Sequence, residues 1–265
     1  MIVTSCSGNN DDAEPIVGGD GVAPTVNGKQ LVRIKHGDSK IDFVYNSDGR
    51  LIKVKQSDNQ YESSYCYESK RIIQSPLDYI YNMNNGHIVE CNYTILPSLE
   101  ENAHSIDVKE TYEYDSNGHL IEFKRPSDYE VDGYSLATFI YSWQNGNITK
   151  ITESTEETEY TAGGVWAELE ICYTSYANTI PFFFVGFGYT DVYLSWQGFF
   201  GKRCKNLPAS QTFTYISEQW GDNKTTETIT YTYDYAFTDG LVTNVTSKRT
   251  YKGNTSIDVY DLEWW

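Results

Sequence analysis

A hairpin pattern built around a glycine recurs along the chain and constrains the fold more than any other feature. The stretch YDSNGHLIEF, residues 114–123, has a tyrosine, a turn ending in Gly118, an aliphatic residue two positions later and an apolar residue five positions after the glycine. Asp-Gly and Asn-Gly pairs accept the positive φ angles that tight hairpin turns require. The pattern occurs five times, around Gly49, Gly86, Gly118, Gly146 and Gly240.

The spacing inside the pattern also predicts a bulge after each turn. Side chains alternate between the two faces of a regular strand, so positions +2 and +5 from the glycine would lie on opposite faces. A bulge adds one residue to one strand and returns both positions to the same face. We therefore expect Leu120 and Phe123 to share a buried face, with the aromatic residue before the turn pairing across from the +2 residue.

The segments between these hairpins alternate polar and apolar residues as strands do. Residues 61–75, 163–176 and 211–235 show this alternation, and residues 249–265 add a closing hairpin. About sixteen candidate strands follow one another without a parallel crossover, and so many antiparallel strands are expected to curl or close. The sequence predicts an all-β fold, a large curved antiparallel meander with a barrel-like shape, formed by residues 29–265 as a single domain.

One segment departs from the strand pattern. Residues 178–208 form the most apolar stretch of the chain, and apolar residues within 189–196 follow the i, i+3, i+4, i+7 spacing of a helix. Thr190 or Asp191 suits the start of this helix and Gly198 its end. We expect a short amphipathic helix that plugs the concave side of the sheet. The alternative is a lid that contacts a ligand.

The N-terminal residues resemble a targeting signal. MIVTSCSGNNDD places Cys6 after a short apolar lead and before small and acidic residues, like the lipidation site of a bacterial lipoprotein. Residues 14–29 are rich in Gly and Pro and suit a flexible tether. We expect residues 1–28 to hold a signal remnant, the lipidation site and the tether, and to anchor the domain to the outer membrane, on its periplasmic or its outer side. The alternative is an ordinary N-terminus with an isolated cysteine.

These features together resemble a known family. The Tyr-Asp-x-x-Gly-x-Leu hairpins, the stretch GFFGKRCKNLP at 198–208 and the anchor sequence resemble a Bacteroidetes-type lipoprotein family of unknown function with a porin-like fold. The resemblance covers residues 29–265 and implies a curved, barrel-like antiparallel sheet without a known activity. The hairpin motif is also distantly similar to the tyrosine–aspartate repeats of Rhs and teneurin shells, which are far longer.

The strands lack the charge-free face that a membrane barrel needs. In residues 119–125, Glu122 and Lys124 fall on one face and Arg125 falls on the other. A charged side chain facing lipid at the bilayer midplane costs about 2–4 kcal/mol. We therefore expect the porin-like shape to have water on its outside.

The charge excludes one class of function. The chain carries 20 basic and 37 acidic residues, for a net charge of −17. A nucleic-acid-binding protein needs a basic surface that displaces counterions from the phosphates, so we expect no nucleic-acid partner. His36, His87 and His119 lie beside turns, and no metal, phosphate-loop or Ser-His-Asp motif appears. We therefore expect no metal and no cofactor.

Two carboxylates form the best catalytic candidate. Glu168 and Glu170 are two residues apart, so on a strand they share a face at about 6.5–7 Å. This separation approaches that of paired carboxylates in glycoside hydrolases, and Trp166 on the same face would stack on a sugar. The alternative is an acidic, solvated face, because Val165, Leu169 and Ile171 make the opposite side apolar.

The cysteines after Cys6 show no CxxC spacing. Cys91 occupies the apolar +5 position of its hairpin, which predicts a buried free thiol. Disulfides among Cys66, Cys91, Cys172 and Cys204 remain an alternative in an exported protein.

The sequence favours a non-enzymatic, exported, lipid-anchored protein that binds or scaffolds. Tyrosine occurs 23 times and tryptophan six times, and both are amphipathic contact residues that lose little entropy on binding. A carbohydrate or a peptide is the expected ligand, with Trp166, Trp196, Phe199 and Phe200 as contacts. The alternatives are a glycan-processing hydrolase that uses Glu168 and Glu170, and a structural component of the cell envelope.

Overall fold

The computed structural model of the protein describes residues 21, 23, 25–57, 62–95, 105–126, 136–156, 164–180, 191–218 and 224–265. These residues form seventeen β-strands and one short helix. The elements are β1 (Thr25–Val26), β2 (Lys29–His36), β3 (Ser39–Tyr45), β4 (Leu51–Gln56), β5 (Glu62–Tyr67), β6 (Arg71–Ser75), β7 (Tyr79–Asn84), β8 (His87–Ile95), β9 (Ile106–Tyr114), β10 (Leu120–Pro126), β11 (Leu136–Gln144), β12 (Asn147–Thr155), β13 (Gly164–Ala177), α1 (Val192–Trp196), β14 (Asn206–Glu218), β15 (Lys224–Thr238), β16 (Leu241–Tyr251) and β17 (Asn254–Trp264).

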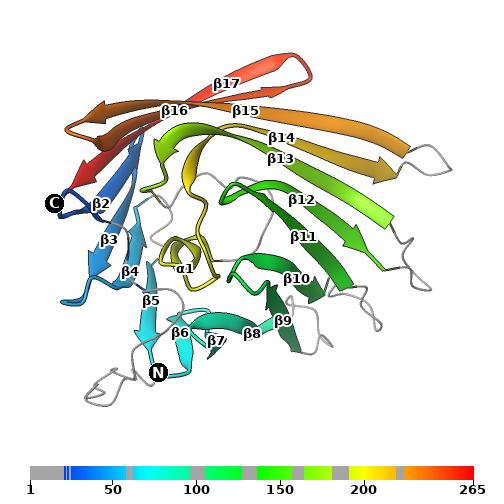
Figure 1. Cartoon of the computed structure of the whole chain (residues 1–265), viewed down its shortest axis with the longest axis horizontal. Coiled ribbons are helices and arrows are strands. Elements are labelled where there is room, and N and C mark those ends of the chain that lie inside the picture. The colour runs from blue at the N-terminus through cyan, green and yellow to red at the C-terminus, as the bar shows by residue number, and fades with distance from the viewer. Residues whose placement is uncertain are drawn as a thin grey trace.

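The strands close into an antiparallel barrel. Within the described residues, the sixteen strands from β2 to β17 pair with their neighbours in sequence order. Strand β17 then pairs with β2, so the ring has no free edge, and α1 lies inside it (Figure 1). The two-residue β1 pairs with the start of β2. The predicted all-β antiparallel meander is confirmed, and the sheet closes because its first and last long strands meet.

The turns gather at two rims because neighbouring strands run in opposite directions. One end, which we call the plugged rim, carries all five copies of the repeated hairpin. It consists of the turns at 27–28, 46–50, 68–70, 85–86, 115–119, 145–146 and 239–240 together with residues 191–205. The opposite end, which we call the far rim, includes the described turns at 37–38, 76–78 and 252–253.

Every copy of the repeated hairpin contains the predicted bulge. In the third copy, Tyr114 pairs with Leu120 and Glu113 pairs with Glu122, so one residue between Leu120 and Glu122 has no partner across the hairpin. The other four copies shift register at the same place. The +2 and +5 side chains are at most 8% exposed in all five copies, which confirms that the bulge brings both to the buried face.

The expected pairing of the aromatic residue with the +2 residue holds in two copies. Tyr45 and Tyr114 each pair with the +2 residue of their hairpin. The turns of these two copies are longer and contain an Asx turn. In the third copy, Asp115 Oδ1 accepts from the backbone N–H groups of Asn117 and His119 at 2.9 and 2.8 Å. The other three copies have a two-residue turn with positive φ at both positions, as at Asn85 and Gly86. In these copies the tyrosine faces the +5 residue instead.

A belt of aromatic side chains closes the wall near the plugged rim. Two strands that are joined at the far rim separate as they approach the plugged rim. Near the plugged rim, some of their backbone carbonyls therefore lie beyond the last pair of residues that the two strands share. The pairing of β8 with β9 reaches only to Glu90, and the Tyr114 hydroxyl donates to the Ile88 carbonyl at 2.5 Å. Seven described aromatic residues donate in this way, namely Tyr45, Tyr67, Tyr114, Trp143, Tyr173, Tyr235 and Trp264.

The outer face of the wall carries ion pairs between neighbouring strands. Lys150 of β12 pairs with Glu168 of β13 at 2.7 Å, and Arg33 of β2 pairs with Glu263 of β17 at 3.0 Å. Partly exposed pairs of this kind require water around them, because unsolvated charges are costly. The outer wall therefore has the chemistry of a water-facing surface at these positions. Among the described residues, no helix is long and apolar enough to cross a membrane.

Candidate functional site

Residues 191–205, which we call the plug segment, occupy the barrel interior at the plugged rim (Figure 1). Asp191 caps α1, because its Oδ1 accepts from the backbone N–H groups of Tyr193 and Leu194 at 2.8 and 3.0 Å. The Tyr65 hydroxyl of the wall donates to Asp191 Oδ2 at 2.8 Å. The predicted cap at Asp191 and the end at Gly198, with φ of 86°, are confirmed. Tyr189 and Thr190 lie outside the described residues.

The plug segment binds four successive copies of the repeated hairpin. Each contact uses a backbone group of the turn glycine itself or of the residue two positions after it, so the repeated hairpin offers the plug a row of equivalent binding positions. The hydrogen bonds run from Leu51 N to Gln197 Oε1 at 2.9 Å, from Ile88 N to Phe199 O at 2.8 Å, from Lys202 N to Gly118 O at 2.8 Å and from Lys205 N to Gly146 O at 2.9 Å.

Three of the aromatic residues proposed as ligand contacts lie within the packing between plug and wall. Trp196, Phe199 and Phe200 are 4%, 0% and 4% exposed. Phe199 stacks on Tyr67 with ring centroids 5.6 Å apart, and Phe200 lies 4.9 Å from Tyr112. In this conformation the three side chains fill the core between the plug and the wall.

The residues proposed for catalysis lie elsewhere, on β13. Glu168 is held by Lys150 on the outer wall, and Glu170 is exposed, whereas Leu169 and Ile171 are buried inside. A bulge at Trp166 interrupts the alternation that would have placed Trp166 on the face of Glu168. The Trp166 indole N–H donates to the Thr155 hydroxyl. The structure therefore separates Trp166 from the paired carboxylates and does not bring them together around a cavity.

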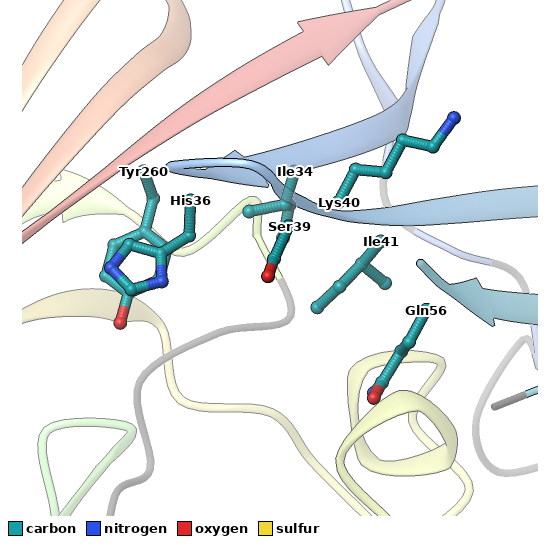
Figure 2. Close-up of a pocket in the computed structure, with 7 residues that line it drawn as sticks. All are labelled: Ile34, His36, Ser39, Lys40, Ile41, Gln56 and Tyr260. Atoms are coloured by element: carbon teal, nitrogen blue, oxygen red, sulfur yellow. The ribbon is translucent and has the colours of Figure 1, made fainter. Parts of the chain in front are cut away.

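A pocket of 240 Å³ lies beside the turn at 37–38 of the far rim (Figure 2). His36 stacks on Tyr260 with ring centroids 4.8 Å apart, and His36 Nε2 lies 3.2 Å from Asp258 Oδ1. Figure 2 shows the Lys40 ammonium directed away from the other lining side chains. The lining residues are Ile34, His36, Ser39, Lys40, Ile41, Gln56 and Tyr260.

The pocket offers neutral polar groups beside aromatic faces. Burial raises the pKa of Tyr260, and the Asp258 carboxylate and Tyr231 raise it further, so the hydroxyl stays protonated at neutral pH and can donate. Gln56 and Ser39 add donors and acceptors. The sequence did not reveal this group, because His36 precedes the turn at Gly37 and was interpreted as a turn residue. The alternation of Ile34 and His36 along one strand was the available signal that His36 faces inward.

A buried carboxylate lies on the inner wall at β9. Glu110 is 3% exposed, and its oxygens accept from the hydroxyls of Tyr93 at 3.1 Å and Tyr112 at 2.6 Å. Burial raises the pKa of Glu110 above its usual range, while the two tyrosines and Arg125 act in the opposite direction. The net cost of ionising Glu110 in the folded state makes it a pH-sensitive element of the wall.

We expect Glu110→Gln to raise the free energy of unfolding at neutral pH relative to the natural protein. Because the folded pKa is raised, the ionised carboxyl opposes folding above that pKa, and the penalty disappears as pH falls toward the unfolded value. The difference between the two proteins should therefore shrink on acidification, which urea unfolding at neutral pH and near pH 4.5 would measure. Glu113→Gln, at an exposed position of the same strand, should show no such change. A loss of stability in Glu110→Gln that is equal at both pH values would contradict the electrostatic origin.

The described cysteines are all free thiols. Cys91 is 1% exposed, which confirms the buried thiol predicted at the +5 position. Cys66, Cys172 and Cys204 are also free, and the Cys204 sulfur accepts from the Ile148 backbone N–H at 3.3 Å within the plug contact. Among the described residues, no three His, Cys, Asp or Glu side chains cluster in a way that could hold a metal ion. Cys6 lies outside them.

The fold and its interior define a porin-like antiparallel barrel that is filled at one rim by its own chain. A porin-like protein from Bacteroides vulgatus ATCC 8482 has a similar structure, with a TM-score of 0.57 and 14% identity over 88% of this chain and 97% of that one. A porin-like protein from Bacteroides uniformis ATCC 8492 gives a TM-score of 0.60 and 15% identity, over 95% of this chain and 100% of that one. At these identities the likeness establishes the fold, which confirms the porin-like shape. No family model and no curated protein matches the sequence.

Proposed function

We propose that the protein is an exported binding protein, lipid-anchored through Cys6 and without enzymatic activity, that holds a small polar ligand in the pocket of Figure 2. The observation that carries this proposal is the His36–Tyr260 stack and its polar neighbours on the inner wall of a barrel filled at the opposite rim. An exported, envelope-associated location is supported by the lipoprotein-like sequence at Cys6 and by the porin-like fold of the two Bacteroides proteins.

Binding accounts for the filled rim better than conduction does. The plug segment is packed into the wall by Trp196, Phe199 and Phe200, and it is hydrogen-bonded to four hairpins, to three through its backbone and to one through the Gln197 side chain. A transport barrel needs a water-filled path between its rims. In the part of the chain that the structure describes, the plug segment fills the interior at one rim, and the pocket of Figure 2 lies at the other.

The pocket chemistry favours a carbohydrate, with a short peptide as the alternative ligand. The volume of 240 Å³ lies below the usual range of about 300–1,000 Å³ for small-molecule pockets, so it suits one sugar ring or one side chain. The exposed part of the Tyr260–His36 stack supplies an apolar surface for a sugar ring, and Gln56 and Ser39 supply hydroxyl partners. The nearby Asp258 carboxylate and the net charge of −17 disfavour an anionic ligand.

We expect Tyr260→Ala to weaken binding of a saccharide identified on a glycan array by about tenfold. Loss of an aromatic contact of this kind costs about 0.5–1.5 kcal/mol beyond the area it buries. Isothermal titration of the full chain would measure the dissociation constant. Tyr176→Ala, at a 48% exposed tyrosine near the plugged rim, is the matched control and should bind normally. Equal affinity of Tyr260→Ala and the natural protein would exclude this pocket, and peptide binding without glycan binding would exclude the carbohydrate.

A further inference from the structure

We infer that the strand edge at the start of β17 pairs with the same edge of a second copy of this chain, which joins two barrels through one continuous antiparallel sheet. The inference goes beyond ligand binding and depends neither on the ligand nor on the lipid anchor. It follows from the position of this edge, from the direction of its backbone groups, and from the side chains that it carries.

The first residues of β17 project beyond the closed ring. Residues 254–261 pair with β16 on one side, but the pairing of β17 with β2 on the other side covers only residues 261–264. Figure 1 shows β17 running past the end of β2. His36 stacks on Tyr260, so it occupies the position beside that residue. In the part of the chain that the structure describes, residues 254–259 therefore have no strand on their second side.

The backbone groups that face this second side belong to alternate residues. The turn between β16 and β17 has two residues, with φ of 49° and 77°. In such a hairpin the residues that flank the turn exchange hydrogen bonds, and the backbone groups then point alternately toward the paired strand and away from it. Asn254 flanks the turn. The N–H and C=O groups of Thr255, Ile257 and Val259 therefore point away from β16. Asp261 continues this alternation, and it pairs with β2 in the same direction.

The side chains of this stretch do not protect it from pairing with another strand. Natural proteins block such edges with lysine, with proline or with a bulge. Residues 254–259 contain no lysine and no proline, and they pair with β16 without a register shift. Ile257 and Val259 are 61% and 45% exposed. Backbone groups and apolar side chains of this kind favour the addition of a further strand to the sheet.

A second copy supplies a strand that matches this edge. Antiparallel pairing about a twofold axis brings the same edge of two copies together. The registers centred on Ser256, Ile257 and Asp258 pair the most backbone groups. Centring on Asp258 places two carboxylates directly opposite each other, which is destabilising. Centring on Ile257 places the start of the second strand where His36 already lies beside Tyr260. The register centred on Ser256 has neither conflict.

In the Ser256 register the two copies complement each other in backbone and in charge. Thr255 of each copy lies opposite Ile257 of the other, and the two pairs form four backbone hydrogen bonds across the axis. The Asp258 carboxylate, the only charged side chain of the stretch, lies opposite the Asn254 amide, which can donate to it. The net charge of −17 on each copy opposes this contact only weakly, because exposed charges more than about 8 Å apart are largely screened at physiological ionic strength.

Sedimentation velocity of the full chain carrying Cys6→Ala, which cannot be lipidated, tests the inference. Only residues 254–258 pair in this register, far fewer than the roughly 20–30 residues a side of a standard interface, so we expect a dimer with a dissociation constant of about 10–100 µM. Ile257→Pro removes a donor that faces only the second copy, and so two of the four hydrogen bonds. At about 1 kcal/mol for each bond, the dissociation constant should rise about 30-fold. Circular dichroism should show an unchanged fold, because edge strands tolerate proline.

Two lysine substitutions form a matched pair. Ile257→Lys places a charge on the edge, as natural edge strands do. Ile140→Lys makes the same change at a 43% exposed isoleucine of β11, which has a strand on both sides. We expect Ile257→Lys to raise the dissociation constant about tenfold, because it removes the cross-strand pairs of Ile257 with Thr255. Ile140→Lys should leave the dissociation constant unchanged.

Cross-linking tests the register itself. The two Ser256 residues form a non-hydrogen-bonded pair with Cα atoms about 4.5 Å apart, which a disulfide can bridge. Ser256→Cys should therefore give a covalent dimer under mild oxidation. Thr255→Cys should not, because its two Cα atoms lie more than about 7 Å apart across the axis. The Cys6→Ala chain, oxidised in the same way, is the control for the remaining natural thiols.

Three results would overturn the inference. The first is a chain that stays monomeric up to about 1 mM. The second is a dimer whose dissociation constant is the same in Ile257→Pro, and the third is an equal effect of the two lysine substitutions. Cross-linking of Thr255→Cys but not of Ser256→Cys would overturn the register. None of these measurements involves a saccharide, so failure here is distinguishable from failure of the glycan experiment.

Discussion

Replacing Gly201 by alanine is expected to lower the free energy of unfolding by about 3 kcal/mol. Gly201 has φ of 82°, where an L-residue costs about 1–2 kcal/mol. A Cβ atom there would also lie 2.5 Å from the Gly118 carbonyl oxygen and 2.9 Å from Tyr114 Cε1. Neither neighbour can move easily, because Tyr114 is held by its hydrogen bond to Ile88 and the Gly118 oxygen accepts from Lys202. Overpacking of this kind adds about 1–3 kcal/mol.

Gly253→Ala separates the two contributions. Gly253 has nearly the same φ, 77°, but a Cβ atom added there would meet nothing within 4 Å. We therefore expect a loss of only about 1 kcal/mol, the conformational part alone. Urea unfolding followed by circular dichroism would measure both variants. Equal losses of unfolding free energy would contradict the close contact between Gly201 of the plug and Gly118 of the third hairpin.

Phe199→Ala is expected to lower the free energy of unfolding by about 3–5 kcal/mol, the usual cost of removing a buried phenylalanine side chain. Phe199 is fully buried, and it stacks on Tyr67 while its carbonyl accepts from Ile88 N. The cavity would open where the plug meets the wall, and Gly21 would lose its support. The measurement is the midpoint and slope of urea unfolding.

Phe237→Ala provides the control, because Phe237 is 39% exposed and should cost under about 1 kcal/mol. If Phe199→Ala were as stable as Phe237→Ala, the plug segment would be a dispensable insert and the barrel could be emptied. Phe199→Ala and Gly201→Ala together therefore test whether the plug segment fills the rim, which the proposed binding function requires.

A polar residue follows the turn glycine in four of the five copies of the hairpin, and it shows where sequence reasoning stopped. Its variable identity suggested only a polar turn position. In the structure, His87 stacks on Tyr114 at 4.9 Å and His119 stacks on Trp143 at 4.5 Å. The Tyr114 hydroxyl also donates to the Ile88 carbonyl, and the Trp143 indole N–H donates to the Leu120 carbonyl. Each acceptor is the +2 residue of the hairpin that contains the histidine. The partners are more than twenty residues apart in the chain, so no local pattern could connect them.

The sequence by itself determined the strands, the turns and the bulges. These depend on local chemistry: an Asx-Gly pair permits positive φ, and apolar residues at +2 and +5 require an extra residue to share one face. The tertiary structure alone decided that β17 meets β2, which four hairpins the plug contacts, and that His36 and Tyr260 form a pocket although they are 260 − 36 = 224 positions apart. Closure depends on the tilt and stagger of all the strands together, and only closure gives the wall an inside.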